Sequence, residues 1–196
     1  MMDPIVIKAE EDVLGLLQQS KQIGWLKMNA NTIQRIMYLL QVLYSFKHDG
    51  DNVFGEYHFT PSLYGPYSIE IAKGIADAQN FERIREDKGG LAICDADEYA
   101  TKEPIKLAWM KSLFLILGRY GEKNVFALTL QDPTYLQAVK SNSERVLDTQ
   151  NRANETIKKL YEFKSYFEER IKDKASLSDE EYLALYFDYI FSQIIK

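Results

Sequence analysis

The strongest pattern in the sequence is a run of apolar side chains that recurs every three or four residues from Ile33 to Tyr44. This spacing places the apolar side chains on one face of an α-helix, so the segment is predicted to be a helix that buries that face. Asn31 is the predicted N-cap, because its side chain can accept from a free backbone N–H of the first turn. Asp49 and Gly50 are predicted to end the helix.

Three further elements are predicted around this helix. A first helix is expected from Glu10 to about Gln22, where an apolar stripe follows an acidic start. Residues 53–59 alternate apolar and other side chains, which predicts a short strand. Gly65 and Pro66 then indicate a turn, and Ser68 is the predicted N-cap of a third helix from Ile69 to about Phe81.

A β-hairpin is predicted after the third helix. Two short strands, Ile84 to Asp87 and Leu91 to Cys94, flank Lys88 and a pair of glycines that can take positive φ. Helix, helix, strand, helix and hairpin is the order of a winged-helix domain, in which residues 69–81 hold the position of the recognition helix and the hairpin is the wing. The sequence therefore predicts a mainly α (α+β) fold with a winged-helix-like part over residues 10–98.

Residues 103–196 are predicted to be helical. Pro104 opens a segment that is apolar on most faces and is expected to be the central core helix. Asp132 and Pro133 start a short helix through Val139, and a seven-residue rhythm from Val146 to Ile171 predicts a long helix. Ser178 and Glu181 form a capping box for the last helix. No linker separates the two parts, so residues 1–196 are predicted to form a single domain.

Charge and composition exclude several classes of protein. The chain carries 24 Lys and Arg against 29 Asp and Glu, and residues 1–100 hold nine of these basic and fifteen of these acidic side chains. Such an acidic half disfavours nucleic-acid binding, which gains affinity by neutralising phosphates. Cys94 is the sole cysteine, the start is acidic, and no apolar run exceeds the five residues of 113–117. A cytoplasmic protein without a signal peptide or membrane span is expected.

No catalytic, cofactor-binding or metal-binding residue is predicted, and the chain is not expected to be an enzyme. Only His48 and His58 are available, and they lack the spacing of a helical metal site. Two carboxylate pairs, Glu10 with Glu11 and Asp95 with Asp97, are typical of solvated faces and turns. Residues 89–90 lie between strands and lack the Lys-Ser/Thr of a phosphate loop.

Two groups of residues are candidates for binding a macromolecule. Basic side chains near the third helix and the hairpin are the candidate contacts of a DNA-binding regulator: Lys73, Arg83, Arg85 and Lys88. Residues 69–85 nevertheless carry three charges of each sign. The last helix is apolar or aromatic around most of its circumference, and it must be covered by the rest of the chain, by a partner or by a second copy. Its candidate partner contacts are Tyr182, Tyr186 and Tyr189.

Two motifs carry a family resemblance. Residues 32–40 read TIQRIMYLL, and residues 64–68 read YGPYS at the start of the third helix. Over about residues 10–95 the chain resembles the Panacea (SocA-like, phage-associated) antitoxin domain, whose pattern pairs an "lQKllYl" helix with a "YGPyS" helix start. Gln34 and Arg35 stand where Gln-Lys is usual, and the later segment from Ala127 to Pro133 is loosely similar but lacks the expected His.

The resemblance implies a non-catalytic protein that binds a partner directly, as an antitoxin or a component of a prokaryotic toxin–antitoxin or phage-defence system. It makes Tyr64, Gly65, Pro66 and Tyr67 candidate partner-binding residues. The acidic first half would suit a basic partner. The alternative prediction is a winged-helix transcription regulator that dimerises through its C-terminal helices.

Overall fold

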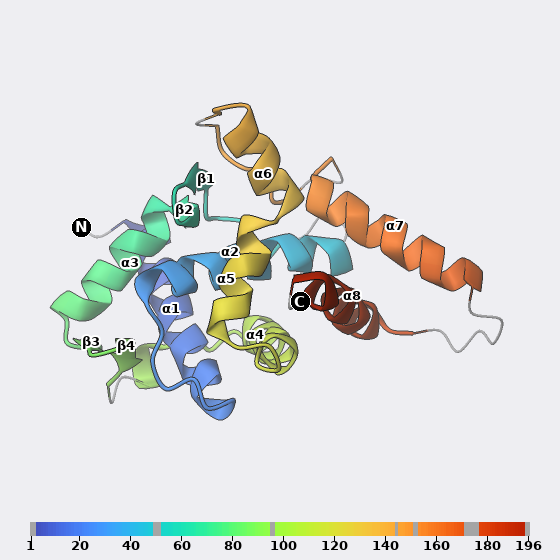
Figure 1. Cartoon of the computed structure of the whole chain (residues 1–196). Helices are drawn as coiled ribbons and strands as arrows, with labels where there is room; N and C mark the ends of the chain where they lie inside the picture. The colour runs from blue at the N-terminus through green and yellow to red at the C-terminus, as the bar shows by residue number, and fades with distance from the viewer. Residues whose placement is uncertain are drawn as a thin grey trace.

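The second helix, α2, runs through the middle of the molecule, and the other elements surround it (Figure 1). Fifteen of its eighteen residues are buried, so it has contacts on nearly every side. The structure is a computed structural model, and it describes residues 3–48, 52–94, 97–143, 145–150, 153–170 and 177–194. The described helices are α1 (Pro4–Gln22), α2 (Ala30–Lys47), α3 (Ile69–Asn80), α4 (Pro104–Leu117), α5 (Glu122–Leu130), α6 (Pro133–Lys140), α7 (Glu155–Arg170) and α8 (Asp179–Ile194).

The strands form two antiparallel hairpins, and the mainly α (α+β) class is confirmed. The first hairpin pairs β1 (Phe59–Ser62) with β2 (Gly65–Ser68), and the second pairs β3 (Ile84–Asp87) with β4 (Gly90–Ile93). A 3-10 turn follows at Asp97–Tyr99. None of the described helices is long and apolar enough to cross a membrane.

The first two helices begin earlier than the sequence predicts. α1 starts at Pro4, not at Glu10, because the Asp3 carboxylate accepts from the Ile5 N–H (3.1 Å) and Pro4 occupies the first helical turn. The N-cap of α2 is Asn29, not Asn31; its side-chain oxygen accepts from the Thr32 N–H at 2.9 Å. The predicted end of α2, residues 49–50, lies outside the described residues.

α3 and the second hairpin follow the prediction closely. Ser68 caps α3 by accepting from the Ile71 N–H (3.4 Å). α3 packs tightly against α1 at Gly74, where a Cβ would lie 2.7 Å from the backbone nitrogen of Glu10. Between α1 and α2, Met28 exchanges two backbone hydrogen bonds with Leu91 of β4 (3.0 and 2.8 Å). The second hairpin is therefore fastened to the connection between the first two helices.

The predicted strand at residues 53–59 is wrong. Residues 53–56 form turns, because the side-chain oxygen of Asn52 accepts from the Phe54 N–H (2.9 Å) and its carbonyl accepts from the Gly55 N–H (2.9 Å). Although this segment is irregular, the side chains of Phe54, Tyr57 and Phe59 are buried. The strand starts only at Phe59, and it pairs with residues 65–68, which were predicted to be a turn.

The C-terminal half is helical with two departures from the prediction. α5 was not predicted, and α7 begins at Glu155, so the prediction of a helix is wrong for the described residues 146–150 and 153–154. The Leu147 N–H donates to the Phe59 carbonyl at 2.7 Å, and this long-range bond holds the segment extended beside the first hairpin. Asn154 then caps α7 by accepting from the N–H groups of Thr156 and Ile157 (2.9 and 3.0 Å). Ile171 lies outside the described residues.

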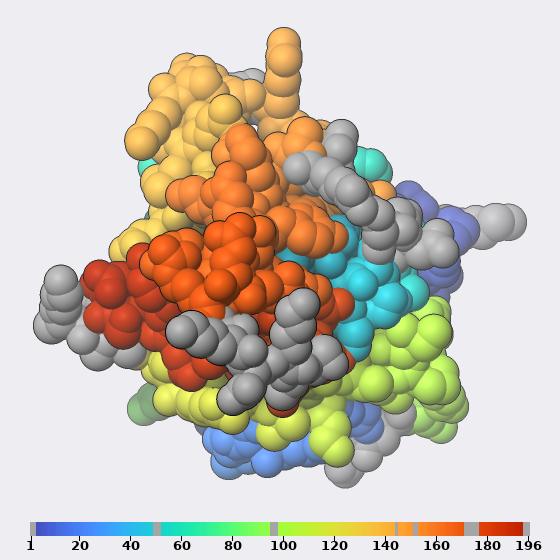
Figure 2. All heavy atoms as spheres, turned by 90° about the vertical axis from the view of Figure 1, so that its right-hand side faces the viewer, coloured from blue at the N-terminus to red at the C-terminus, as the bar shows by residue number. Residues whose placement is uncertain are grey.

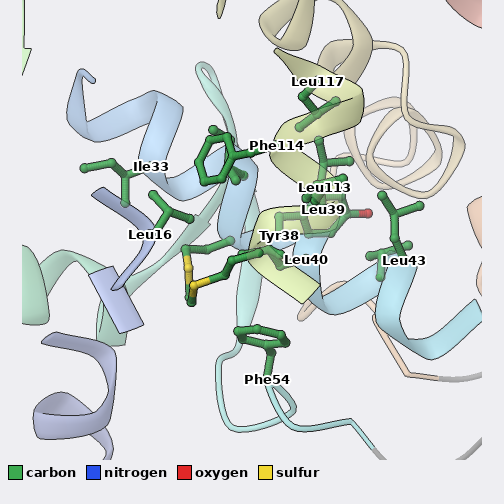
Figure 3. Close-up of a cluster of buried hydrophobic side chains, with 14 of the residues drawn as sticks. Leu16, Ile33, Tyr38, Leu39, Leu40, Leu43, Phe54, Leu113, Phe114 and Leu117 are labelled. Atoms are coloured by element: carbon green, nitrogen blue, oxygen red, sulfur yellow. The ribbon is translucent and has the colours of Figure 1, made fainter. Parts of the chain in front are cut away.

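The hydrophobic core joins both halves of the chain. Figure 3 shows part of one cluster of buried side chains, which contains Leu16 of α1, Ile33, Tyr38 and Leu40 of α2, Phe54, and residues 113, 114 and 117 of α4. The same cluster continues to Phe187 and Phe191 of α8. Residues 10–98 and 103–196 therefore share one body of buried side chains, and α4 is part of the core as predicted.

α7 and α8 lie side by side over one face of the molecule (Figure 2). The predicted capping box starts α8: the Ser178 N–H donates to the Glu181 carboxylate (2.7 Å), and the Glu181 N–H donates to the Ser178 hydroxyl (3.3 Å). Leu183, Phe187 and Phe191 are almost fully buried. The apolar helix is therefore covered largely by its own chain, through α4, α5 and α7.

Candidate protein-binding surface

The turn of the first hairpin carries the most exposed large apolar side chain among the described residues. Leu63 is 91% exposed and Tyr64 is 63% exposed, and both lie between the paired residues Ser62 and Gly65. Tyr67 of β2 and Ile69 of α3 are also exposed. Leu63, Tyr64, Tyr67 and Ile69 are called the hairpin surface below. Isolated apolar residues on a surface are ordinary, but a group of them on one hairpin and at the start of the helix that follows it is typical of a binding site.

The four residues predicted from the YGPYS motif divide into two pairs. Tyr64 and Tyr67 are exposed, whereas Gly65 and Pro66 are buried. Gly65 has a φ of +113°, and a Cβ at this position would lie 3.3 Å from the Nε of Arg35. Glycine therefore satisfies both an unusual backbone conformation and a close approach to α2.

Arg35 of α2 binds the backbone of the first hairpin's turn. Its Nε and Nη2 both donate to the Tyr64 carbonyl, at 2.9 and 2.6 Å. The guanidinium also lies 4.1 Å from the ring centroid of Phe126 in α5. Burial lowers the pKa of Arg35, and the nearby Glu122 carboxylate partly offsets that effect. The main chain of the exposed turn is therefore fixed by a buried cation.

Gln34 fastens the other end of β2. Its amide nitrogen donates to the Ser68 carbonyl and its amide oxygen accepts from the Ser68 N–H, both at 2.9 Å. Both residues are buried, so the loss of either partner would leave polar groups without hydrogen bonds. The two motifs that carry the family resemblance are thus in direct contact. Residue 34 is hydrogen-bonded to residue 68, and its neighbour, residue 35, is hydrogen-bonded to residue 64.

Tyr38, one turn further along α2, connects the hairpin to α6. Its hydroxyl donates to Asp132 (2.9 Å), which also accepts from the Tyr135 N–H (2.9 Å) as the N-cap of α6. The Tyr135 hydroxyl in turn donates to the Ser62 carbonyl at 2.6 Å. Burial raises the pKa of both Tyr38 and Asp132. The hairpin surface is therefore presented on a rigid base rather than on a loose loop.

The four candidate DNA contacts differ in their exposure and in their pairing. Lys73, Arg85 and Lys88 are exposed, but Arg83 donates to the buried Glu10 carboxylate at 2.7 Å. The Arg83 guanidinium also lies 3.9 Å from the ring centroid of Tyr99. Burial raises the pKa of Glu10, and the pairing with Arg83 lowers it in part. Arg83 therefore has a structural role at the base of the second hairpin.

The three candidate tyrosines of α8 also differ in their exposure. Tyr182 and Tyr186 are buried, with their rings against Phe167 and Phe163 of α7, whereas Tyr189 is 53% exposed. Burial raises the pKa of Tyr186 to about 12. Two of the three side chains are therefore already covered by α7, and Tyr189 alone keeps an exposed ring.

A buried charge cluster was not found from the sequence. Lys106 of α4 donates to the Asp12 carboxylate of α1 (2.8 Å), and the Tyr57 hydroxyl donates to the same oxygen (2.6 Å). Burial raises the pKa of Asp12, and Lys106 opposes that effect. The hint in the sequence was a charged residue on the apolar side of each helix. Because all three side chains are enclosed, the cluster joins α1, α4 and the 52–58 segment rather than forming an open site.

The described residues contain no group of three or more metal-ligating side chains. Of the carboxylate pairs, Glu10 is buried and Glu11 is exposed, and the Asp95–Asp97 pair includes side chains outside the described residues. The most distinctive feature for recognition is therefore the hairpin surface. Sequence reasoning missed two of its members, Leu63 and Ile69; the available clue was an apolar residue beside the YGPYS motif. No protein-family model, curated protein or solved structure matches the chain.

Proposed function

We propose that this chain is a non-catalytic protein-binding module whose hairpin surface contacts the partner. The observation that carries the proposal is the exposure of Leu63 and Tyr64 on a hairpin whose backbone is held by Arg35 at the turn and by Gln34 at Ser68. A rigid element loses little conformational entropy when it binds, so its apolar side chains contribute more of their burial energy to affinity. Apolar and aromatic anchors of this kind dominate protein interfaces.

The resemblance to the Panacea antitoxin domain gives the proposal its biological setting. An antitoxin or another component of a prokaryotic toxin–antitoxin or phage-defence system acts by direct contact with a second protein. Two of the four residues that the resemblance implicates, Tyr64 and Tyr67, are exposed in the structure. The cytoplasm is the proposed compartment, because such partners act there.

The alternative of a winged-helix DNA-binding regulator has weaker support. Arg83 is committed to Glu10 and Tyr99, and Asp87 beside Lys88 is paired with Lys27 at 2.7 Å. α3 presents Lys73 together with Glu70 and Asp77 rather than a basic face. A duplex would gain few phosphate contacts from this arrangement.

The test compares the wild-type chain with a Leu63→Asp/Tyr64→Asp double variant, each tagged and expressed at native level in the source cell. Leu26→Asp is the matched control, because Leu26 is 64% exposed and lies in the connection between α1 and α2. Wild type and control are expected to retain the same stoichiometric partner, and the double variant at least about tenfold less. Equal melting temperatures of the three chains will show that folding is unaffected.

The partner is then expressed alone and with each chain. For an antitoxin, the partner alone should arrest growth, wild type and Leu26→Asp should restore it, and the double variant should not. Equal partner recovery by the double variant would contradict the proposed surface. Recovery of salt-sensitive DNA without a stoichiometric protein would favour the regulator and overturn the proposal.

A further inference from the structure

A cavity of about 200 Å³ lies where α2, α5, α7 and α8 meet. Protein interiors contain few voids larger than a water molecule, and an apolar cavity of about 150 Å³ is large enough to bind benzene. The cavity therefore has room for one ligand slightly larger than benzene. Its mouth is marked by Gln131 and Lys159, the two lining residues that are exposed.

One side of the cavity is apolar. Its wall is made of side chains from α2, α5 and α8: Leu39, Leu43, Leu128, Phe187 and Ile190. All but Ile190 are buried, and Ile190 is half-buried. Ligand sites in proteins are typically apolar with a few polar groups that fix orientation, so we expect the apolar part of a ligand to lie against this wall.

The same cavity is lined by polar side chains from α7 and from the start of α6. They are Asp132, the N-cap of α6, and Thr156 and Lys159 of α7. The Thr156 hydroxyl donates to Oδ2 of Asp132 at 2.5 Å. Lys159 follows Thr156 by three residues, so the two side chains are neighbours on one helix face. One carboxylate and one ammonium group thus line a single cavity.

These two opposite charges are not paired. Asp132 is 5% exposed. Its hydrogen bonds come from neutral groups of Tyr38, Tyr135 and Thr156. Among the residues that the structure describes, neither Asp132 nor Lys159 forms an ion pair with the other or with a third residue. Burial raises the pKa of Asp132, so an ammonium group beside this carboxylate would be favourable.

Tyr186 of α8 offers a further hydrogen-bond donor. It lines the cavity, and its hydroxyl makes no hydrogen bond to the residues that the structure describes. Burial, with a contribution from the charge of Asp132, raises the pKa of Tyr186 to about 12, so the hydroxyl keeps its proton at neutral pH. Such a hydroxyl gains a partner when a ligand brings an acceptor into the cavity.

We infer that this cavity binds a free α-amino acid with an apolar side chain, which lies against the leucines while the ammonium group lies beside Asp132 and the carboxylate meets Lys159. A simple amine would leave Lys159 unpaired, and a simple carboxylic acid would bring a second negative charge to Asp132. An amino acid carries both charges, so it satisfies both residues. The site is separate from the proposed partner contact, because no residue of the hairpin surface lines the cavity.

Binding is measured by isothermal titration calorimetry of the full chain with probes of matched shape. L-Leucine is the expected ligand. Isopentylamine lacks its carboxylate, isocaproate lacks its ammonium group, and L-asparagine keeps both charges but ends in an amide of similar shape. L-Leucine is expected to bind, and each of the other probes at least about tenfold more weakly, because each loses a charged contact or the contact with the apolar wall.

Lys159→Glu tests the position of the ligand carboxylate. Lys158→Glu is the matched control, because Lys158 is the neighbouring exposed lysine and does not line the cavity. Lys159→Glu should weaken L-leucine binding at least about tenfold and bind isopentylamine at least as well as wild type does. Lys158→Glu should bind every probe as wild type does. Equal melting temperatures of the three unliganded chains will show that both variants fold.

Several results would overturn the inference. Absence of L-leucine binding at millimolar concentration would show that the cavity does not take this class of ligand. Equal affinity for L-leucine and L-asparagine would place the ligand away from the apolar wall. Isopentylamine or isocaproate bound as tightly as L-leucine would show that one of the two charges is not recognised, and unchanged L-leucine binding by Lys159→Glu would place the carboxylate elsewhere.

Discussion

The two hairpins at the ends of α3 differ in the side chains at their turns and in the contacts that hold them. The second one, β3–β4, has glycines and charged residues at its turn, and it is tied to the body by Met28, Lys27 and the Arg83–Glu10 pair. The first one, β1–β2, has apolar residues at its turn, and buried side chains of α2 and α6 hold its backbone. The hairpin in the position of a wing is therefore the polar one, and the hairpin in front of α3 carries the surface suited to a partner.

This difference teaches that exposure and anchoring must be considered together. An apolar residue on a mobile turn would lose entropy on binding, and a well-held polar turn would gain little from burial. Leu63 and Tyr64 combine exposure with a backbone that Arg35 holds, whereas Lys88 is an exposed charged residue beside two glycines with positive φ.

The largest expected effect concerns the anchors. Gln34→Ala removes both hydrogen bonds to Ser68 and leaves two buried backbone groups without partners, so it should lower the free energy of unfolding by about 3 kcal/mol. Lys27→Ala removes the exposed ion pair to Asp87 at the second hairpin and should change stability little. Urea unfolding measures both. Similar losses in the two variants would show that the hairpins are anchored alike.

The next effect compares two glycines with similar backbone conformations. Gly65 and Gly89 have φ values of +113° and +106°, so alanine should cost about 1–2 kcal/mol at either position through backbone strain. Gly65→Ala should cost more, because its Cβ lies 3.3 Å from Arg35 Nε whereas the Cβ at Gly89 meets nothing within 4 Å. Thermal unfolding of the two variants decides this, and an equal loss would mean that Arg35 moves aside freely.

The smallest effect concerns pH. Burial raises the pKa of Glu10 above its ordinary 4.5, despite Arg83. The folded chain therefore binds this proton more readily than the unfolded chain, so Glu10 adds stability as pH falls through the window just above 4.5 and loses that contribution as pH rises. The stability of wild type relative to Glu10→Gln should thus be greater at about pH 5 than at about pH 7.

The measurement is urea unfolding of both chains at each pH, with Gln34→Ala as the reference at the first hairpin. An amide does not titrate, so the deficit of Gln34→Ala should be the same at both values. A wild-type advantage over Glu10→Gln that shrinks as pH falls would show that pairing with Arg83 outweighs burial.

Local patterns predicted the elements whose boundaries are set locally. Ser68 caps α3, Ser178 and Glu181 cap α8, and the Gly89–Gly90 pair turns the second hairpin, because each interaction joins residues close in sequence. The first hairpin was missed since Gly65 and Pro66 are typical of turns, and their place in a strand depends on Arg35, which binds the Tyr64 carbonyl 29 residues further along the chain.

Elements that depend on distant contacts escaped the sequence. The heptad rhythm across residues 146–154 predicts a helix, but the Leu147 N–H bonds to Phe59 and the Gln150 side chain donates to Gly55 at 2.7 Å. The same limit affected the candidate site. Tyr182 and Tyr186 resemble interface residues in isolation, and only the position of α7 shows that they are buried.

The most direct test of the binding surface places a photo-crosslinking amino acid at either hairpin turn in living cells. One chain carries it in place of Leu63 and the other in place of Lys88, and both are exposed positions. The account predicts a discrete crosslinked protein adduct from position 63 and none from position 88. An adduct confined to position 88, or none at either turn, would contradict the claim that the first hairpin binds the partner.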